Sequence, residues 1–256
     1  MPAAAFRTTA FLFSIACYGM FLLVFLYLLA FLANVQFAPL VTRSIDVGRD
    51  MGSQQLALLI DVGLILMFGL QHSVMARPGF KRVWTRVVPK ELERSAYVLM
   101  SSVVLALLMW QWRPIPTPVL WHADAGWSVA LAWSVMIVGV LVLLWTTFLI
   151  DHFELFGLRQ GWETLRAKEL RGPAFVTPWL YKIVRHPLYL GWLLIFWGAP
   201  TMTAGHLLFS AGMSVYILIA LRYEERDLVQ HIGERYERYR QQVPALVPRP
   251  GRRFTG

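Results

Sequence analysis

The sequence predicts an all-α membrane protein, a polytopic membrane helix bundle of five to six spans with a C-terminal helical hairpin and a cytoplasmic tail helix. Of its 256 residues, 57% are hydrophobic and only 15% are charged, whereas a typical soluble domain carries about 25% charged residues. The apolar residues form runs long enough to cross a hydrocarbon core of about 30 Å. We therefore expect residues 1–256 to form a single integral membrane domain.

Six apolar segments are the expected spans. Four of them, which we expect to form an N-terminal bundle over 10–150, lie near 10–33, 55–75, 95–112 and 127–150. The hairpin follows near 187–199 and 206–222, and its first arm is short because Pro187 and Pro200 bound it. That arm is tilted, begins earlier or is re-entrant, so five full spans with one shallow arm stays open as an alternative. Residues 113–122 contain three prolines, which exclude a regular helix there.

Basic residues alternate between the connecting segments. Lys and Arg are frequent in 76–94, in 151–186 and after 222, and they are scarce in 34–54, 113–126 and 200–205. The positive-inside rule then places both termini and the two basic loops in the cytoplasm. The net charge of +9 is explained by topology and anionic lipid. No nucleic-acid motif is present, so nucleic-acid binding is not expected.

Ionisable residues in or beside apolar runs are costly in lipid, and they indicate where chemistry is located. They cluster at the cytoplasmic ends of the expected spans, at His72, at 151–154, at 185–186 and at 224–225. Asp61 is the exception inside a span, and it either hydrogen-bonds to a neighbouring span or lines a substrate path. The single cysteine, Cys17, is expected to be a packing residue, and the histidines lack a metal-ligand spacing, so no metal is expected.

The strongest local pattern is Arg-His-Pro-Leu-Tyr-Leu-Gly at 185–191, followed by Glu224 and Glu225. Its chemistry suits a sulfonium methyl donor, whose carboxylate favours an arginine or a helix N-terminus and whose ammonium and ribose favour carboxylates. Adjacent helical residues point about 100° apart, so one glutamate is expected to face the ligand while the other pairs with Arg222 or Arg226. Gly191 would allow a ligand or another helix to come close.

This order of residues, continued by the two tyrosines of 236–239 and by Val243-Pro244, resembles the membrane methyltransferases typified by isoprenylcysteine carboxyl methyltransferase and the phospholipid N-methyltransferases. The resemblance covers about 178–250 and implies that the hairpin and the tail form a site for S-adenosylmethionine. The candidate cofactor-binding residues are Tyr181, Arg185, His186, Tyr189, Leu190, Gly191, Glu224 and Glu225.

Two further stretches, 71–77 (Gln-His-Ser-Val-Met-Ala-Arg) and 151–160 (Asp-His-Phe-Glu-Leu-Phe-Gly-Leu-Arg-Gln), are similar to the bacterial methanethiol S-methyltransferases and their NnrU-like relatives. This resemblance implies methyl transfer from S-adenosylmethionine to methanethiol, with release of dimethyl sulfide, in the inner (cytoplasmic) membrane of a bacterium. Attack requires the thiolate, and histidine titrates near neutral pH. The candidate catalytic residues are His72, Asp151 and His152, and the candidate substrate residues are Gln71 and Glu154.

Two other functions stay open at this point. One is methylation of a larger lipophilic acceptor, such as a prenyl-cysteine or an amino lipid. The other is a non-enzymatic NnrU-like role in nitrogen-oxide metabolism, with haem bound through His72 and His152. The expected partners are the lipid bilayer and a small-molecule thiol, and no obligate protein partner is evident.

Overall fold

The computed structural model describes residues 3–49, 52–170 and 177–249; residue 250, the last of the predicted cofactor segment, lies outside this part. Among these described residues, five helices are long and apolar enough to cross a membrane: α1 (Ala3–Leu32), α2 (Gln54–Ala76), α4 (Lys90–Gln111), α5 (Gly126–Ile150) and α9 (Ala204–Ile232). α8 (Pro187–Trp197) is apolar but has 11 residues, or about 16 Å, roughly half of a hydrocarbon core. The predicted all-α membrane fold with five to six spans is confirmed.

The helices divide into two compact units, which we describe separately. Unit 1 comprises residues 1–116 and 151–174, and unit 2 comprises 117–150 and 175–256. The predicted N-terminal bundle over 10–150 differs from this division, because α5 packs with α8 in unit 2. Glycines on both helices explain the contact, since a Cβ at Gly139 would lie 2.8 Å from the carbonyl oxygen of Gly191. Such small residues let two helix backbones approach closely in a membrane.

In unit 1, α1 packs against α4 and against α7 (Leu158–Leu165), and α2 packs against α4. Small polar residues fill the centre of this packing. The Ser95 hydroxyl donates to Ser14 Oγ at 2.9 Å, and a Cβ at Gly161 would lie 2.5 Å from that same oxygen. The short helices α3 (Pro78–Trp84) and α6 (His152–Leu155) follow α2 and α5 in the chain.

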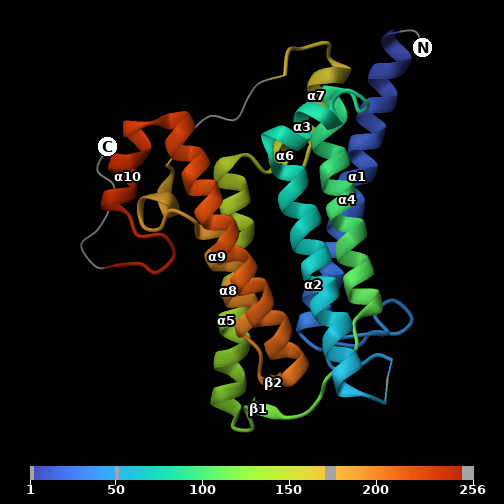
Figure 1. Ribbon diagram of the computed structural model, residues 1–256, viewed down its shortest axis with the longest axis vertical. Coiled ribbons are helices and arrows are strands. Elements are labelled where there is room, and N and C mark those ends of the chain that lie inside the picture. Colours follow the sequence, from blue (N-terminus) through green and yellow to red (C-terminus); the bar gives the residue numbers. More distant parts are fainter. Residues whose placement is uncertain (1–2, 50–51, 171–176, 250–256) are drawn as a thin grey trace. The chain divides into compact units, whose positions relative to one another are not determined.

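In unit 2, two short strands that the sequence did not predict join the helices at one end. β1 (Val119–His122) pairs antiparallel with β2 (Thr201–Thr203), with Trp121 opposite Met202. β1 precedes α5, and β2 lies between the end of α8 and the start of α9 (Figure 1). α9 therefore runs back along α8, and its C-terminal turns come beside the start of α8.

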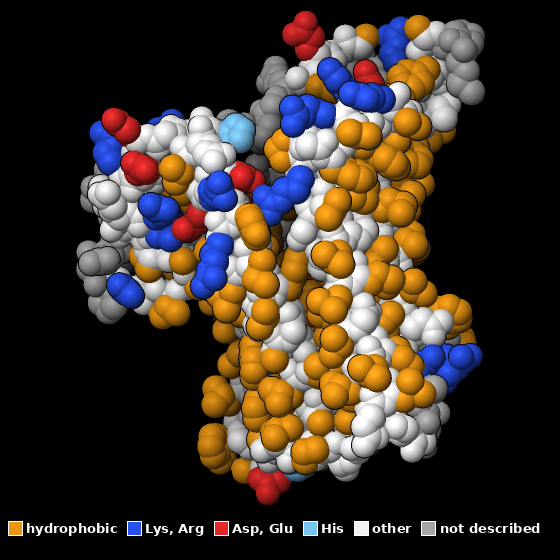
Figure 2. Space-filling model, in the orientation of Figure 1, with side chains coloured by type: hydrophobic (Ala, Val, Ile, Leu, Met, Phe, Trp, Pro, Cys, Tyr) orange, Lys and Arg blue, Asp and Glu red, His pale blue; other side chains and the backbone are white. Residues whose placement is uncertain are grey.

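α9 continues ten residues beyond the predicted end at 222 and stops before Gly233, whose φ of +68° suits glycine. The tail helix α10 (Glu234–Gln242) then packs back on α9, because its buried Tyr236 and Tyr239, with Val243 directly after the helix, form an apolar cluster with partly buried residues of α9. A 3₁₀ turn, η1 (Trp179–Lys182), precedes α8. Figure 2 shows apolar side chains along the long helices and charged ones gathered over the end of α9 and over α10.

Asp61 has a structural role. Its side chain is fully buried in α2, and Oδ1 accepts the backbone N–H of Arg113 at 2.9 Å. This bond fixes the chain just after α4 ends, so the hydrogen-bonding alternative of the sequence analysis is the one that the structure supports.

Candidate functional site

The arginine and histidine that precede α8 meet one carboxylate of α9. Arg185 Nε and Nη2 lie 2.7 and 2.6 Å from Glu225 Oε1, and His186 Nε2 lies 3.0 Å from the same oxygen. All three side chains are buried or nearly so. Residues forty positions apart in the sequence therefore form one closed ion-pair cluster.

The same arginine holds the C-terminal tail. Its Nη1 donates to the carbonyl oxygen of Arg240 at 2.9 Å and to that of Val243. The backbone N–H groups of Arg185 and His186 donate to the carbonyl oxygens of Pro244 and Ala245, at 2.9 and 3.0 Å. The predicted pairing of the glutamates is corrected here, because Glu225 pairs with Arg185 and not with Arg222 or Arg226. We therefore assign Arg185 and Glu225 to holding the site together.

Glu224 is the accessible carboxylate of the pair. Its side chain is 45% exposed, and Oε2 accepts the Tyr189 hydroxyl at 2.6 Å. The Tyr189 ring stacks on His186 at 5.5 Å between centroids. Tyr181 lies nearby, with its carbonyl oxygen accepting the Tyr239 hydroxyl at 2.5 Å, and burial together with the charge of Glu224 raises the pKa of Tyr181. A carboxylate beside aromatic rings can bind a cation.

Leu190 and Gly191 contribute through the helix. The Leu190 N–H donates to the His186 carbonyl oxygen at 3.1 Å and closes the first turn of α8. A Cβ on Gly191 would lie 2.9 Å from the Gly139 carbonyl oxygen and from the Leu143 nitrogen. The sequence analysis allowed a ligand or another helix beside Gly191, and the structure places α5 there. The cofactor-binding role of Gly191 stays a prediction.

In unit 1, His72 lies near the end of α2 with both ring nitrogens engaged. Nε2 lies 2.8 Å from the Tyr97 hydroxyl, and Nδ1 lies 3.1 Å from Ser101 Oγ, both on α4. The Phe68 ring stacks on the imidazole at 5.4 Å. The preceding residue, Gln71, donates from Nε2 to the sulfur of Met75 at 3.0 Å.

His152, the first residue of α6, is buried and forms a similar pair. Its Nε2 lies 2.8 Å from the Tyr18 hydroxyl of α1, and its ring makes edge contacts with Tyr18 and Phe156. Burial lowers the pKa of His152, although the charge of Asp151 acts in the opposite direction. The imidazole is therefore neutral near pH 7 and can accept a proton.

Asp151 and Glu154 surround an arginine. Arg159 contacts Asp151 Oδ2, and it lies 3.4 Å from both Glu154 Oε2 and Glu163 Oε1. Asp151 also caps α6, since Oδ1 accepts the Glu154 N–H at 3.0 Å, and its own backbone has a φ of +104°. The catalytic and substrate roles expected of these two carboxylates stay predictions; in the structure both contact Arg159, and Asp151 also caps α6.

Sequence reasoning missed the two tyrosines that bind the histidines, Tyr18 and Tyr97. Each is a hydroxyl inside a long apolar run, and such a group in lipid needs a hydrogen-bond partner. That requirement was the sequence signal that could have pointed to these tyrosines.

In the part of the chain that the structure describes, no group of three or more His, Cys, Asp or Glu side chains could hold a metal ion.

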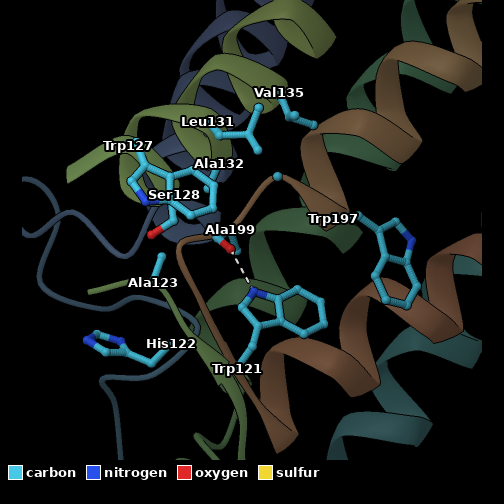
Figure 3. A pocket seen from close by; sticks show the side chains of 11 residues that line it. Trp121, His122, Ala123, Trp127, Ser128, Leu131, Ala132, Val135, Trp197 and Ala199 are labelled. Atoms are coloured by element: carbon cyan, nitrogen blue, oxygen red, sulfur yellow. Dashed lines mark hydrogen bonds between the residues drawn. The ribbon is translucent and has the colours of Figure 1, made fainter. Parts of the chain in front are cut away.

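A pocket of about 430 Å³ lies at the sheet end of unit 2, at the far end of α8 from Glu224. Figure 3 shows Trp121, Trp127 and Trp197 around it, with the Trp121 indole donating to the Ala199 carbonyl oxygen at 3.1 Å. Its walls carry no carboxylate, lysine or arginine. Tryptophan is typical of membrane interfaces, so we assign this pocket to the lipid boundary.

Comparison with known proteins places this chain in a family. The family model described as NnrU protein matches residues 60–247, a range that includes His72, His152 and the whole Arg185–Glu225 cluster. The chain belongs to the NnrU family. No solved structure matches it.

Several relatives match nearly the whole chain. Methanethiol S-methyltransferase 2 of Bradyrhizobium diazoefficiens is 50% identical over 95% of this chain and 91% of its own length. Methanethiol S-methyltransferase of Crocosphaera subtropica is 47% identical over 96% and 94%. Methanethiol S-methyltransferase of Mycobacterium tuberculosis is 43% identical over 96% and 98%. The similarity to the NnrU-like membrane proteins predicted from 71–77 and 151–160 is confirmed.

Proposed function

We propose that this chain is a membrane methyltransferase that transfers a methyl group from S-adenosylmethionine to methanethiol and releases dimethyl sulfide. The observation that carries the proposal is similarity over almost the full length, at 43–50% identity, to chains named methanethiol S-methyltransferase. The five apolar helices make the chain an integral membrane protein. Methanethiol is small and apolar, so it can reach a site in a helix bundle through lipid.

The residues of unit 2 fit the proposed methyl donor. Glu224 offers an accessible carboxylate for the ammonium group or the ribose hydroxyls. α8 begins at Pro187, and the positive end of its helix dipole favours a carboxylate beside this turn. Tyr189 and Tyr181 offer aromatic surface for a positively charged sulfur or for adenine. When bound, the donor supplies an electrophilic methyl carbon.

The proposed proton acceptor is His152. Methanethiol must lose the proton on its sulfur before the sulfur forms a bond to the methyl carbon. His72 lies within a span, and both of its ring nitrogens already bond to Tyr97 and Ser101. His152 lies just beyond α5, its lowered pKa keeps it neutral, and its Nε2 shares a hydrogen bond with Tyr18 that would orient the ring.

The haem alternative is weaker on the same geometry. Iron coordination by His72 would require the ring to break its bond to Tyr97 or to Ser101.

We also propose that the site faces the cytoplasm, in the inner membrane of a bacterium with both termini cytoplasmic. The support is the excess of Lys and Arg in 76–94, 151–186 and the tail.

Headspace analysis of purified protein in detergent or nanodiscs tests the proposal. Incubation with S-adenosylmethionine and methanethiol is expected to yield dimethyl sulfide, whereas Glu224→Ala loses most of this activity. A matched control is Glu234→Ala, which removes a carboxylate from the first turn of α10. Absence of dimethyl sulfide with correctly folded wild-type protein would refute the proposal.

A further inference from the structure

An aromatic cluster in unit 1 contacts both histidine–tyrosine pairs. Its buried residues are Met75, Tyr97 and Val98, and partly buried rings pack against them. Tyr97 bonds to His72, whereas Phe156 contacts His152 with 4.9 Å between ring centroids. We call this set the aromatic cluster; its members are Phe21, Met75, Phe80, Trp84, Tyr97, Val98 and Phe156.

Two buried polar atoms without a partner border this cluster. In the part of the chain that the structure describes, Gln71 Oε1 and Trp84 Nε1 are buried and make no hydrogen bond. Gln71 contacts the cluster through the Met75 sulfur, and Trp84 packs against its core. A buried polar atom left unsatisfied is costly and requires an explanation. One atom is an acceptor and the other a donor, so the pair suits a ligand at this cluster that carries both a donor and an acceptor.

A thiol has this combination of properties. Its S–H is a weak donor that can bond to Gln71 Oε1, and its sulfur can accept a hydrogen bond from the Trp84 indole N–H. Sulfur also makes favourable contacts with aromatic rings. From these contacts we infer that the aromatic cluster binds the substrate thiol, with Gln71 and Trp84 as its polar contacts. This inference rests on the proposed function and specifies where the acceptor binds.

The cluster also suggests why the thiol is small. The rings of Phe21 and Phe156 are stacked with centroids 3.9 Å apart. This close pair comes from two different elements, α1 and the residue that follows α6. A one-carbon thiol requires little space beside these rings, whereas each further methylene must displace one of them. Phe21 and Phe156 therefore set the chain-length limit of the acceptor.

Replacement of one ring tests this assignment. Phe156→Ala and the milder Phe156→Leu are compared with wild type for methanethiol, ethanethiol and 1-propanethiol, with kcat/KM measured for each. The kcat/KM for ethanethiol relative to that for methanethiol is expected to rise about tenfold in Phe156→Ala, since one methylene group typically changes kcat/KM by a factor of 10 or more. Phe11→Ala is the matched control, because this α1 ring contacts Trp162 and lies outside the cluster.

Trp84→Phe gives a second and milder test. Loss of one hydrogen bond to sulfur is expected to raise KM for methanethiol about fivefold, whereas KM for S-adenosylmethionine stays unchanged. An unchanged chain-length ratio in both Phe156 variants, or an unchanged thiol KM in Trp84→Phe, would overturn the assignment. Failure of the proposed function has a different signature, namely no methyl transfer to methanethiol by the wild type.

Discussion

Replacement of the two neighbouring glutamates of α9 by glutamine is expected to have different effects: Glu225→Gln lowers stability, whereas Glu224→Gln weakens binding of the methyl donor. Glu225 is mostly buried and accepts two contacts from Arg185 and one from His186. Glu225→Gln leaves the buried guanidinium without its counter-charge. Removal of one partner of a buried ion pair typically costs about 3–5 kcal/mol. We take the lower value, since the Arg240 and Val243 carbonyl oxygens still accept from Arg185.

A loss of about 3 kcal/mol corresponds to a fall in Tm of about 6–12 °C for a chain of this size. The C-terminal tail should also become sensitive to protease, because residues 244–245 are held by the backbone of 185–186. Glu224→Gln removes an exposed carboxylate. It should change Tm by less than about 2 °C, consistent with the small effects of most surface substitutions, and it should weaken binding of S-adenosylmethionine about tenfold or more.

The assay combines thermal unfolding followed by tryptophan fluorescence, limited proteolysis of the tail, and calorimetric titration with S-adenosylmethionine. Arg226→Gln serves as a control, since it removes a charge from the same turn of α9. If Glu225→Gln leaves Tm and the tail unchanged, or if Glu224→Gln binds the donor as wild type does, the division of roles between the two glutamates is refuted.

Three further predictions follow from the geometry. Gly191→Ala should lower Tm, because its Cβ would clash with the backbone of α5 at 2.9 Å, whereas Gly63→Ala, which meets nothing within 4 Å, should leave Tm equal or raise it; equal losses in both variants would contradict the packing argument. As pH falls, the rate of methyl transfer at saturating thiol should decline with its midpoint below pH 6.5, since burial lowers the pKa of His152 and its base form persists to lower pH. A decline centred above pH 6.5 would count against His152 as the base. Tyr18→Phe should lower kcat while it leaves Tm nearly unchanged, because it removes the hydroxyl that orients His152. An unchanged kcat would contradict this positioning role.

The helices were predictable because lipid imposes a simple rule. A backbone in hydrocarbon must satisfy its own hydrogen bonds, so each long apolar run has to be a helix. The expected spans at 10–33, 55–75, 95–112 and 127–150 correspond to α1, α2, α4 and α5. The grouping of α5 with α8 was not predictable in this way, since it depends on Gly139 and Gly191, two residues far apart in the sequence.

The contacts between site residues were only partly predictable. Sequence reasoning expected Arg185, His186 and the two glutamates to lie together, and the structure places them in contact. It could not tell which glutamate would be buried, because that depends on how the tail folds back over Arg185. The hydroxyls of Tyr18 and Tyr97 in apolar runs indicated that each needs a hydrogen-bond partner. The sequence could not show that the partners are His152 and His72, since these pairs join different helices.

The most direct test of the central claim follows the methyl group itself. Purified protein is incubated with S-adenosylmethionine carrying a trideuterated methyl group and with unlabelled methanethiol, and the headspace is measured by mass spectrometry. We predict dimethyl sulfide that carries one deuterated and one unlabelled methyl group, formed by the wild type and strongly reduced in Glu224→Ala. Dimethyl sulfide without the label, or no dimethyl sulfide from folded wild-type protein, would contradict the account.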